Sequence, residues 1–566
     1  MRSFDGWRSA VVGAIVIMMV CVVARGESSA PIGTEGKGSQ GAVAAGSAES
    51  VGIGLAILRQ GGNAADAATA TILALSVTDA TDFCFGGEVS ILVYDAERKV
   101  VEAVSGLGVA PRLATREFFL THARGKLDAA VPDLDATVSI PGDGLLSAAT
   151  PAALDACLTL LSRYGTLRFE DVVGPTLQIL DRRELAWHPR LARTLRRLVE
   201  AERQAPADRL RGLRLVADYF YRGPIAREIS AWSAENGGLI RFSDLATHVT
   251  RIEDPVSVDY RGYTVLKCGS WTQGPYLLQT LRLLEGFDLK GMGHNTAATI
   301  HATIEAMKLA LADRDAFYAD PLFADVPLTE LLSKEYANLR RPLINLRQAS
   351  TVQQPGDPRR GQALLADVEA RRGLRGETRD TTTCAVADRL GNVIAATPSG
   401  WHGVEVGETG VWLGTRLQSF NLWEGHPNCI EPGKRPRITL TPTLVLEGNR
   451  PVLAVSVAGG DAQDQTSIQI VLNHIDFGLA PTASLAAFRF GTDHHLGSFR
   501  QRPPVLGSLS LSQRAVPSLA EELGRLGHQV QMTRLIGSPI AIAIDPATGV
   551  FEAAGDENAN RHAGAY

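Results

Sequence analysis

The apolar positions of the first folded segment repeat with the period of a helix. They recur three and four residues apart over residues 49–60, and Gly61-Gly62 then interrupts the pattern. Asn63 suits the N-cap position of the Ala-rich run 64–77. Two consecutive helices are therefore expected.

Strand patterns follow these helices. Residues 89–94 and 100–104 are rich in Val and Ile, and the polar segment 95–99 between them predicts a β-hairpin. Amphipathic, Arg- and Leu-rich stretches over residues 150–245 then predict helices. The next predicted elements are a strand over 260–267, a helix over 274–285 and a helix over 295–317 with Asn295 as its cap.

Residues 349–380 have a different composition. They are poor in aromatics and rich in Arg, Gly, Gln and Asp, which is typical of a solvated, mobile segment. Strand pairs from both ends of the chain, with helices around them, favour an α+β fold of stacked sheets flanked by helices. The later predicted elements are strands over 381–387, 393–397, 441–446 and 452–457, and a helix over 462–477.

The N-terminus is not typical of a folded domain. Arg2 and Arg8 precede an apolar run over residues 10–24, which is shorter than the roughly 20 residues needed to span a bilayer. The pattern predicts a secretory signal peptide over 1–26, with an uncleaved N-terminal anchor as the alternative. Residues 27–48 then predict a flexible lead-in. Either interpretation places the rest of the chain in the periplasm or outside the cell, and only the anchor would keep it at a membrane.

Composition narrows the function. The 566 residues include 56 Lys and Arg against 61 Asp and Glu, a net charge of −5, so no nucleic-acid partner is expected. The six cysteines contain no C-x-x-C pair, and the adjacent His494-His495 is typical of a solvated loop, so neither a metal nor another cofactor is expected. A disulfide among the five cysteines after the signal peptide stays open. Signatures of serine hydrolases, P-loop proteins, zinc proteases and dinucleotide-binding proteins are absent from the sequence.

The junction between Asp380 and Thr381 carries the first chemical signal. The polar segment ends there at three consecutive threonines, which begin a predicted strand. One interpretation is that threonine simply favours strands. The other is an N-terminal nucleophile: cleavage at this bond would give Thr381 a free α-amine, whose pKa of about 8 lets it act as the base for its own hydroxyl.

Such a nucleophile needs hydrogen-bond donors for an oxyanion. The predicted strand 452–457 runs into Ala458-Gly459-Gly460-Asp461, and a predicted helix follows. Glycines at a strand-to-helix turn expose backbone N–H groups, and the helix dipole adds partial positive charge. A purely structural turn is the alternative. Together with the threonine junction, Gly459 and Gly460 become candidate oxyanion donors.

Several motifs along the chain together resemble one enzyme family, the γ-glutamyltransferases of the N-terminal-nucleophile hydrolase superfamily. The resemblance implies an αββα sandwich, with two antiparallel sheets between helical layers. It also implies a precursor cut into a large fragment, 49–380, and a small fragment, 381–566, which stay associated as one core over 49–566. The motifs are ESVGIGLAILRQGGNAADA (49–67), DYRGYTVLK (259–267), GPYLLQTLRLLEGFDL (274–289), TTTCAVAD with Gly391-Asn392, PGKRPRITLTPTLV (432–445) and AGGDAQDQ (458–465).

The resemblance also implies roles for individual residues. It places the nucleophile at Thr381, the hydroxyl that supports the nucleophile at Ser399, and the oxyanion glycines at Gly459 and Gly460. These positions predict a catalytic apparatus that acts on an amide carbonyl without a cofactor.

The substrate pocket departs from the family pattern. The arginine that would hold a substrate α-carboxylate falls at Leu107, and the acidic residue that would hold the α-amine falls at Gln418. The paired serines fall at Ile438 and Thr439, and a binding asparagine falls at Trp401. Losing the arginine removes a bidentate, charge-assisted contact, and an apolar Leu107 disfavours a buried carboxylate. The candidate substrate contacts are Trp401, His402, Arg416, Gln418 and Thr439.

Three functions are consistent with these observations. The first is an N-terminal-threonine amidohydrolase or acyltransferase whose small-molecule amide substrate is not a γ-glutamyl compound, with Arg416 a candidate replacement for the lost arginine. The second is γ-glutamyl transfer or glutathione hydrolysis itself. The third is a non-catalytic, unprocessed binding protein with this fold, which Thr383 favours because the family motif has a histidine there.

Overall fold

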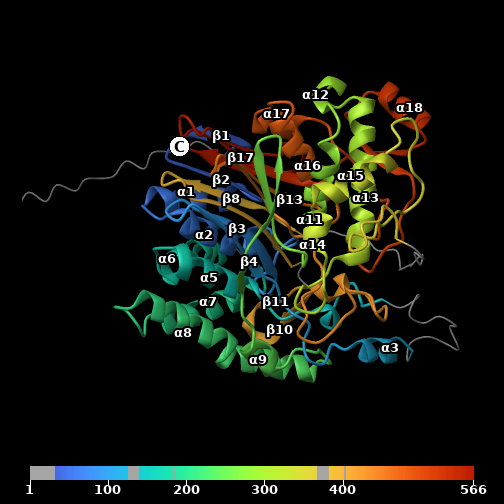
Figure 1. The fold of residues 1–566 in the computed structure, drawn as a ribbon. Helices are drawn as coiled ribbons and strands as arrows, with labels where there is room; N and C mark the ends of the chain where they lie inside the picture. Colours follow the sequence, from blue (N-terminus) through green and yellow to red (C-terminus); the bar gives the residue numbers. More distant parts are fainter. Residues whose placement is uncertain (1–31, 125–138, 183–184, 366–380, 401–402) are drawn as a thin grey trace, which may run out of the picture. The chain divides into compact units, whose positions relative to one another are not determined.

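Two seven-stranded antiparallel sheets lie at the centre of the fold (Figure 1). The computed structural model describes residues 32–124, 139–182, 185–365, 381–400 and 403–566, and residues 32–566 form one compact unit. The first sheet has the strand order β19 (His562–Ala565), β2 (Gly41–Ala45), β8 (Cys384–Asp388), β9 (Val393–Ser399), β3 (Glu88–Asp95), β4 (Val100–Gly106) and β5 (Arg251–Glu253). The second has the order β1 (Glu35–Gly38), β18 (Phe551–Gly555), β17 (Ser538–Ile544), β13 (Arg450–Ala458), β12 (Thr443–Glu447), β7 (Tyr263–Lys267) and β6 (Val256–Tyr260).

Helices cover the outer face of each sheet, so the predicted α+β sandwich is confirmed (Figure 1). Helices α1 (Ala48–Arg59), α2 (Ala64–Thr78) and α5 (Ala153–Tyr164) lie on the first sheet, and α6 (Phe169–Arg182), α7 (His188–Glu202), α8 (Arg209–Tyr221) and α9 (Pro224–Glu235) pack outside them. Helices α11 (Pro275–Leu284), α16 (Ala462–Ile475) and α17 (Pro481–Ala486) lie on the second sheet, α13 (Ala297–Phe317) packs on α11, and α18 (Pro517–Arg525) packs on α13.

Short elements complete the described structure. They include α3 (Arg116–Arg124), α10 (Phe242–Ala246), α12 (Leu289–Met292), α14 (Leu328–Leu331), α15 (Lys334–Arg340), the 3₁₀ turn η4 (Arg416–Ser419), the hairpin β10 (Val404–Val406) and β11 (Val411–Leu413), and a small sheet of β14 (Phe490–Gly491), β15 (Ser508–Ser512) and β16 (Gln529–Thr533). Among the described helices, none is long and apolar enough to cross a membrane.

The alternation of side chains along each strand separates three apolar layers. In β8, Cys384 and Val386 face the helices of the first sheet, whereas Ala385 and Ala387 face the second sheet. The layer between the sheets contains many alanines, which let the two backbones approach closely. The buried alanines of this layer are Ala42, Ala44, Ala103, Ala385, Ala387, Ala395, Ala454, Ala553 and Ala563.

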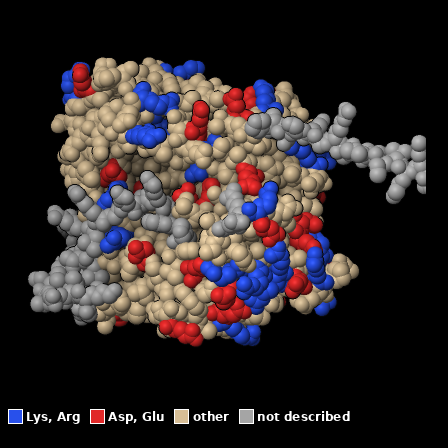
Figure 2. All heavy atoms as spheres, turned by 180° about the vertical axis from the view of Figure 1, so that it is seen from behind, with Lys and Arg blue, Asp and Glu red and all other residues tan. Residues whose placement is uncertain are grey.

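Charged side chains of both signs are interspersed over the face shown in Figure 2. Helix α7 illustrates the pattern, since Arg193, Arg196 and Arg197 each pair with an acidic residue. Such exposed pairs contribute little to stability, roughly 0–1 kcal/mol each.

The predicted helices and hairpin at the start of the chain are confirmed. The Asn63 side chain accepts hydrogen bonds from the backbone of Ala65 and Asp66 at the start of α2, and β3 pairs with β4. The predicted strand 260–267 is instead a hairpin, because Arg261 and Gly262 take positive φ angles of 49° and 88° between β6 and β7.

Three other predictions need correction. Thr296, not Asn295, caps α13, and its Oγ1 accepts the N–H of Thr299 at 3.3 Å. Strand β8 begins at Cys384, so Thr381 lies just before it. His494 and His495 are not solvated: both are buried, and burial lowers the pKa of His494 to about 4.

The two segments predicted to be flexible are partly ordered. Residues 32–48 contain β1 and β2, so the flexible lead-in is wrong over this range. Within 349–365, the backbone N–H of Gly356 donates to Asp313, and the Arg340 guanidinium donates to the carbonyl of Gln354, because that stretch packs on α13 and α15. The remainder of the predicted mobile segment, 366–380, and the predicted signal peptide, 1–26, lie outside the described residues. The five described cysteines are free and buried.

A fully buried ion pair joins the second sheet to its helix α16. The ammonium of Lys267, at the end of β7, lies 2.7 Å from the carboxylate of Asp464, and neither side chain is exposed. Lys267 also donates to the carbonyl of Thr441 and to the hydroxyl of Thr443, at 2.7 and 2.8 Å. Removing one member of such a pair leaves an uncompensated buried charge.

We therefore expect Lys267→Met to lower the free energy of unfolding by about 3–5 kcal/mol, measured by urea denaturation. The control is Lys37→Met, which breaks the exposed Lys37–Glu552 pair of similar length, 2.6 Å, and should cost about 1 kcal/mol or less. The double variant Lys267→Met/Asp464→Leu should recover part of the loss. Equal losses of unfolding free energy for Lys267→Met and Lys37→Met would show that burial of the Lys267–Asp464 pair has no special effect on stability.

Candidate active site

The predicted nucleophile lies where the first sheet meets the loops of the second. Thr381 immediately precedes β8, is 2% exposed and has a φ of 152°, which is rare for a β-branched residue. Its Oγ1 lies 3.5 Å from Oγ of Ser399, at the end of the neighbouring strand β9. The structure therefore brings together the two hydroxyls that the sequence assigned to one site.

A third side chain, which the sequence analysis missed, orients the Thr381 hydroxyl. Gln463, in the first turn of α16, is fully buried. When its amide nitrogen faces the carbonyls of Val457 and Thr439, at 3.0 and 2.8 Å, its oxygen accepts from Thr381 Oγ1 at 3.2 Å. This orientation satisfies both ends of the amide. Gln463 lies within the AGGDAQDQ motif, but only its contact with Thr381 reveals a role.

The two candidate oxyanion glycines form the turn from β13 into α16. Gly459 and Gly460 have φ angles of 124° and 57°, and their carbonyls accept the N–H groups of Ala462 and Gln463. A Cβ atom at Gly459 would lie 3.2 Å from Cα of Gly537. Both the backbone conformation and the close approach therefore require glycine at position 459.

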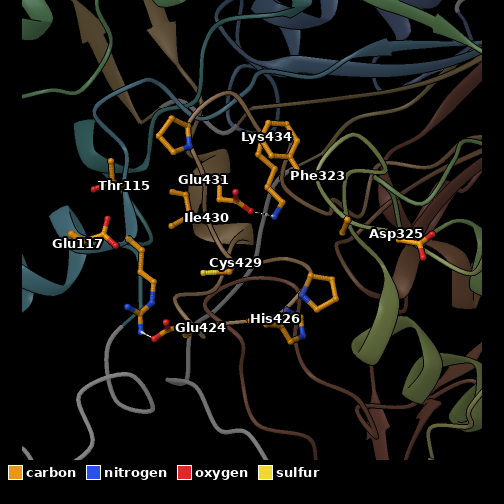
Figure 3. A pocket seen from close by; sticks show the side chains of 15 residues that line it. Thr115, Glu117, Phe323, Asp325, Glu424, His426, Cys429, Ile430, Glu431 and Lys434 are labelled. Atoms are coloured by element: carbon orange, nitrogen blue, oxygen red, sulfur yellow. Dashed lines mark hydrogen bonds and ion pairs between the residues drawn. The ribbon is translucent and has the colours of Figure 1, made fainter.

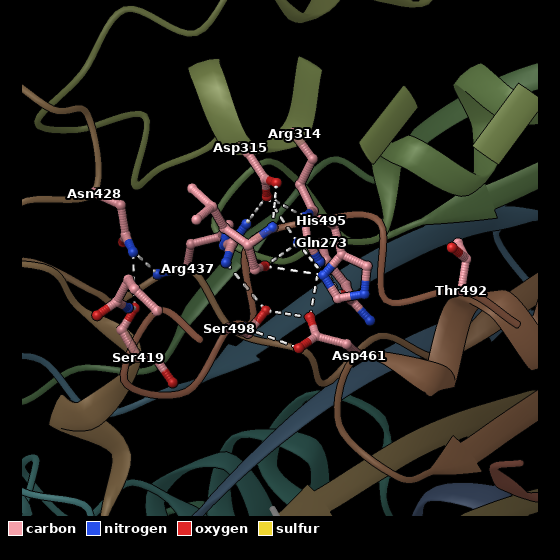
Figure 4. A network of polar contacts seen from close by, with 12 residues as sticks. Gln273, Arg314, Asp315, Ser419, Asn428, Arg437, Asp461, Thr492, His495 and Ser498 are labelled. Carbon is pink, nitrogen blue, oxygen red and sulfur yellow. Dashed lines mark hydrogen bonds and ion pairs between the residues drawn. The ribbon is translucent and has the colours of Figure 1, made fainter. Parts of the chain in front are cut away.

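A network of buried charges holds the end of this turn (Figure 4). The Asp461 carboxylate accepts from the guanidinium of Arg314 at 2.8 Å and from the backbone N–H of Ser498 at 2.8 Å. Burial raises the pKa of Asp461, but the nearby His495 and Arg314 outweigh it and hold this pKa well below its ordinary range. Arg437 joins the network through Asp315 and Ser498, and burial, reinforced by Arg314, lowers the pKa of Arg437 to about 10.

Thr381 and Gly459 line one cavity of about 950 Å³. Four carboxylates and two guanidiniums also line it, and most of them are paired. Arg561 pairs with Asp79 at 3.3 Å and donates to the carbonyl of Thr381 at 3.4 Å, whereas Arg502 pairs with Asp493. Arg561 comes from the C-terminal segment beside β19, so both ends of the chain contribute to this site. The charged lining residues are Asp79, Asp82, Asp461, Asp493, Arg502 and Arg561.

The predicted substrate contacts are placed differently. Arg416, Gln418 and Thr439 are buried and do not line the 950 Å³ cavity, and Gln418 donates to the hydroxyl of Thr415 at 3.1 Å. Leu107 packs in the apolar layer between the sheets. Trp401 and His402 lie outside the described residues.

Arg416 turns toward the nucleophile instead. Its Nε donates to Glu88 at 2.6 Å, and its Nη2 donates to Oγ of Ser399 at 2.7 Å. Burial raises the pKa of Glu88, while the Arg416 charge opposes that shift. Glu88 carried no signal in the sequence, because its partner is 328 residues away.

A second hollow, of about 550 Å³, contains none of the predicted site residues (Figure 3). Its charged side chains are mostly paired: Lys434 lies 2.8 Å from Glu431 and over the ring of Phe323, and Arg116 lies 3.6 Å from Glu424. This arrangement leaves the hollow without a predicted chemical role.

One group of side chains among the described residues could coordinate a metal ion. His301, Glu305 and His528 offer ligand atoms within 4.8 Å of one another. The Nδ1 of His301 and the Nε2 of His528 are 2.7 Å apart, and the Lys308 ammonium lies 2.6 Å from Glu305. The lysine therefore already supplies the positive charge that a metal ion would bring to this carboxylate.

The fold and this site define an N-terminal-nucleophile hydrolase sandwich. The chain belongs to the gamma-glutamyltranspeptidase family, which it matches over residues 50–182 and 178–566. It is 29% identical to a glutathione hydrolase proenzyme of Bacillus subtilis over 90% of this chain and 88% of that protein. It is 30% identical to an acylase ACY 1 proenzyme of a Pseudomonas species over 90% of each. A cephalosporin acylase structure from Bacillus halodurans superimposes with a TM-score of 0.77, at 28% identity, over 94% and 97% of the two chains.

The turn geometry predicts a difference between two glycines. We expect Gly459→Ala to lower the free energy of unfolding by about 3 kcal/mol, since it adds strain and a contact with Gly537. Gly448→Ala, in the β12–β13 turn, should cost about 1 kcal/mol, because φ is also positive there but no atom lies within 4 Å of the added Cβ. Urea or thermal unfolding of the two variants tests the comparison, and equal losses would show that the Gly459 turn relaxes freely.

Proposed function

We propose that this chain is an N-terminal-threonine amide hydrolase or acyltransferase that matures by cleavage between Asp380 and Thr381. The main support for this proposal is the position of Thr381 Oγ1, which lies between Ser399 and Gln463 and beside the cavity that Gly459 also lines. The positive φ of Thr381 supports cleavage, because backbone strain on one side of the bond favours a reaction that releases it. Several relatives bear the word proenzyme in their names.

The maturation step follows from these groups. Oγ1 of Thr381 attacks the carbonyl carbon of Asp380, and the bond to the Thr381 nitrogen breaks as that nitrogen takes up a proton. The resulting ester is then hydrolysed by water, which leaves the carboxylate of Asp380 and a free α-amine on Thr381. Its pKa of about 8 suits a general base near neutral pH.

The mature enzyme repeats this chemistry on an external amide. The α-amine of Thr381 takes the hydroxyl proton as Oγ1 attacks the amide carbonyl, and the backbone N–H groups of Gly459 and Gly460 stabilise the oxyanion. The same proton passes to the departing amine as the carbon–nitrogen bond breaks. Water, or an acceptor amine, then releases the acyl group from the ester.

We propose that the acyl group is not γ-glutamyl. Leu107 lies in the apolar layer between the sheets, and Gln418 is neutral. Arg416 already donates hydrogen bonds to Glu88 and Ser399. At these three positions the zwitterionic head of a glutamyl group would not find the charged partners that offset its desolvation. The acylase names among the relatives support this choice.

The second candidate is γ-glutamyl transfer. Arg502 and Arg561 line the cavity and favour it, because either could exchange its aspartate partner for a substrate carboxylate.

We also propose, from the N-terminal sequence alone, that residues 1–26 export the chain; cell fractionation with N-terminal sequencing would test this.

The maturation proposal predicts two fragments, 27–380 and 381–566, with Thr381 as the first residue of the smaller one. Thr381→Ala should remain a single chain on long incubation, because it lacks the attacking oxygen. Electrophoresis and N-terminal sequencing measure both outcomes. The control is Thr383→Ala, two residues away, whose hydroxyl has no described partner and which should process normally. Wild-type protein that stays intact, or Thr381→Ala that still cleaves, would support the non-catalytic alternative.

The substrate proposal predicts an order among three anilides that share a five-carbon acyl chain. The γ-glutamyl anilide carries an α-amine and a carboxylate, the glutaryl anilide only the carboxylate, and the pentanoyl anilide neither. We expect kcat/KM for the γ-glutamyl compound to be at least about tenfold below the better of the other two, since one unpaired charge costs more than 1.4 kcal/mol. A tenfold preference for γ-glutamyl would favour the second candidate.

A further inference from the structure

Strand register places an acidic residue directly beside the supporting hydroxyl. In the β3–β9 pairing, Glu88 lies opposite Ser399. Arg416, from the turn η4, reaches across both, with its Nε 2.6 Å from Glu88 and its Nη2 2.7 Å from Ser399. The ring of Phe499 covers the guanidinium: its centroid lies 5.5 Å from Cζ of Arg416. The side chains of Arg416 and Glu88 are only 1% and 3% exposed, so both charges are shielded from bulk solvent.

The side-chain amide of Gln463 decides the direction of the hydrogen bond between the two hydroxyls. A guanidinium only donates, so Oγ of Ser399 accepts from Arg416, and its second lone pair could also accept from Thr381 Oγ1; its own hydrogen becomes available to Thr381 once the Thr381 hydrogen goes to Gln463. Thr381 Oγ1, 3.5 Å away, is the neighbouring oxygen on the side of the cavity. The Thr381 hydrogen goes to the Gln463 oxygen at 3.2 Å, and the Gln463 nitrogen is occupied by the carbonyls of Val457 and Thr439. In this arrangement Arg416 donates to Ser399, Ser399 donates to Thr381, and Thr381 donates to Gln463.

We propose that Arg416, held in place by Glu88, is a positioning residue that makes Ser399 a hydrogen-bond donor toward Thr381 Oγ1. This inference rests on the proposed function, since it concerns the reactivity of Thr381. As Oγ1 loses its proton during attack, the Ser399 hydrogen bond, polarised by the cation behind it, stabilises the developing negative charge. Ser399 keeps its own proton throughout. Arg416 therefore acts on the nucleophile and not on a substrate carboxylate.

Glu88 is required because the cation is buried. An isolated guanidinium at this depth would be destabilising, and the Glu88 carboxylate offsets that cost while fixing which nitrogen faces Ser399. The cross-strand register fixes Glu88 beside Ser399, so of the three side chains only Arg416 comes from a turn. A lysine at position 416 could keep the charge but could not bind both partners in the same plane.

The precursor distinguishes this role from substrate binding, because its cleavage at Asp380–Thr381 uses no external substrate. We expect Ser399→Ala and Arg416→Met to slow cleavage about 10- to 100-fold, the loss of one charge-assisted hydrogen bond. Arg416→Lys and Ser399→Thr should fall between these variants and wild type. After maturation, kcat should fall by a similar factor, while KM changes by less than about twofold.

The outcomes separate the two proposals. If wild-type precursor never cleaves, the proposed function fails; if it cleaves and Ser399→Ala and Arg416→Met do so at the wild-type rate, only this inference fails. A KM that rises tenfold or more for a carboxylate-bearing substrate, at an unchanged cleavage rate, would make Arg416 a substrate contact. Should Arg416→Met not fold, Ser399→Ala and Arg416→Lys decide, because both keep a cation next to Glu88. Melting temperatures of all variants identify losses due to unfolding.

Discussion

The close packing of the two sheets is the constraint on which the candidate site depends. Ser399 ends β9 of the first sheet and Thr381 lies just before β8 of that sheet, whereas Gly459, Gly460 and Gln463 follow β13 of the second. Small side chains between the sheets keep the backbones close, and the Ser456 hydroxyl on β13 donates to the carbonyl of Ala396 on β9 at 2.8 Å. A larger residue in this layer would separate the nucleophile from its oxyanion turn, because packed interiors transmit changes in volume.

Buried ion pairs surround the site on several sides. Lys267 fixes Asp464 on α16, Arg314 fixes Asp461 at the start of that helix, and Arg416 fixes Glu88 beside Ser399. Such pairs add little net stability compared with apolar packing. If one member moves away, however, the other becomes an uncompensated buried charge, which is strongly destabilising. They therefore favour one arrangement of the turns around Thr381 over its alternatives. An N-terminal nucleophile needs this rigidity, because its hydroxyl must meet one carbonyl during maturation and another during turnover.

Similarity to known proteins does not single out one substrate for this chain. The chain is almost equally similar to a glutathione hydrolase and to an acylase. In this chain, Leu107 has joined the core and Arg416 faces inward to Ser399. The proposed reacting groups are separate from the positions proposed to recognise the rest of the substrate, and one fold can support different specificities in this way.

The sequence by itself determined several of the elements and indicated the candidate reacting groups. Helical periodicity predicted α1 and α2, the polar turn between apolar runs predicted the β3–β4 hairpin, and paired glycines after a strand predicted the turn at Gly459. These features depend on neighbours within a few residues, so local propensity is sufficient to specify them. Tertiary structure alone decided that residues 35–38 and 41–45 form strands, that His494 is buried, and that Arg416 pairs with Glu88 across 328 residues. The orientation of a buried side chain depends on which distant surfaces pack around it, and no local pattern contains that information.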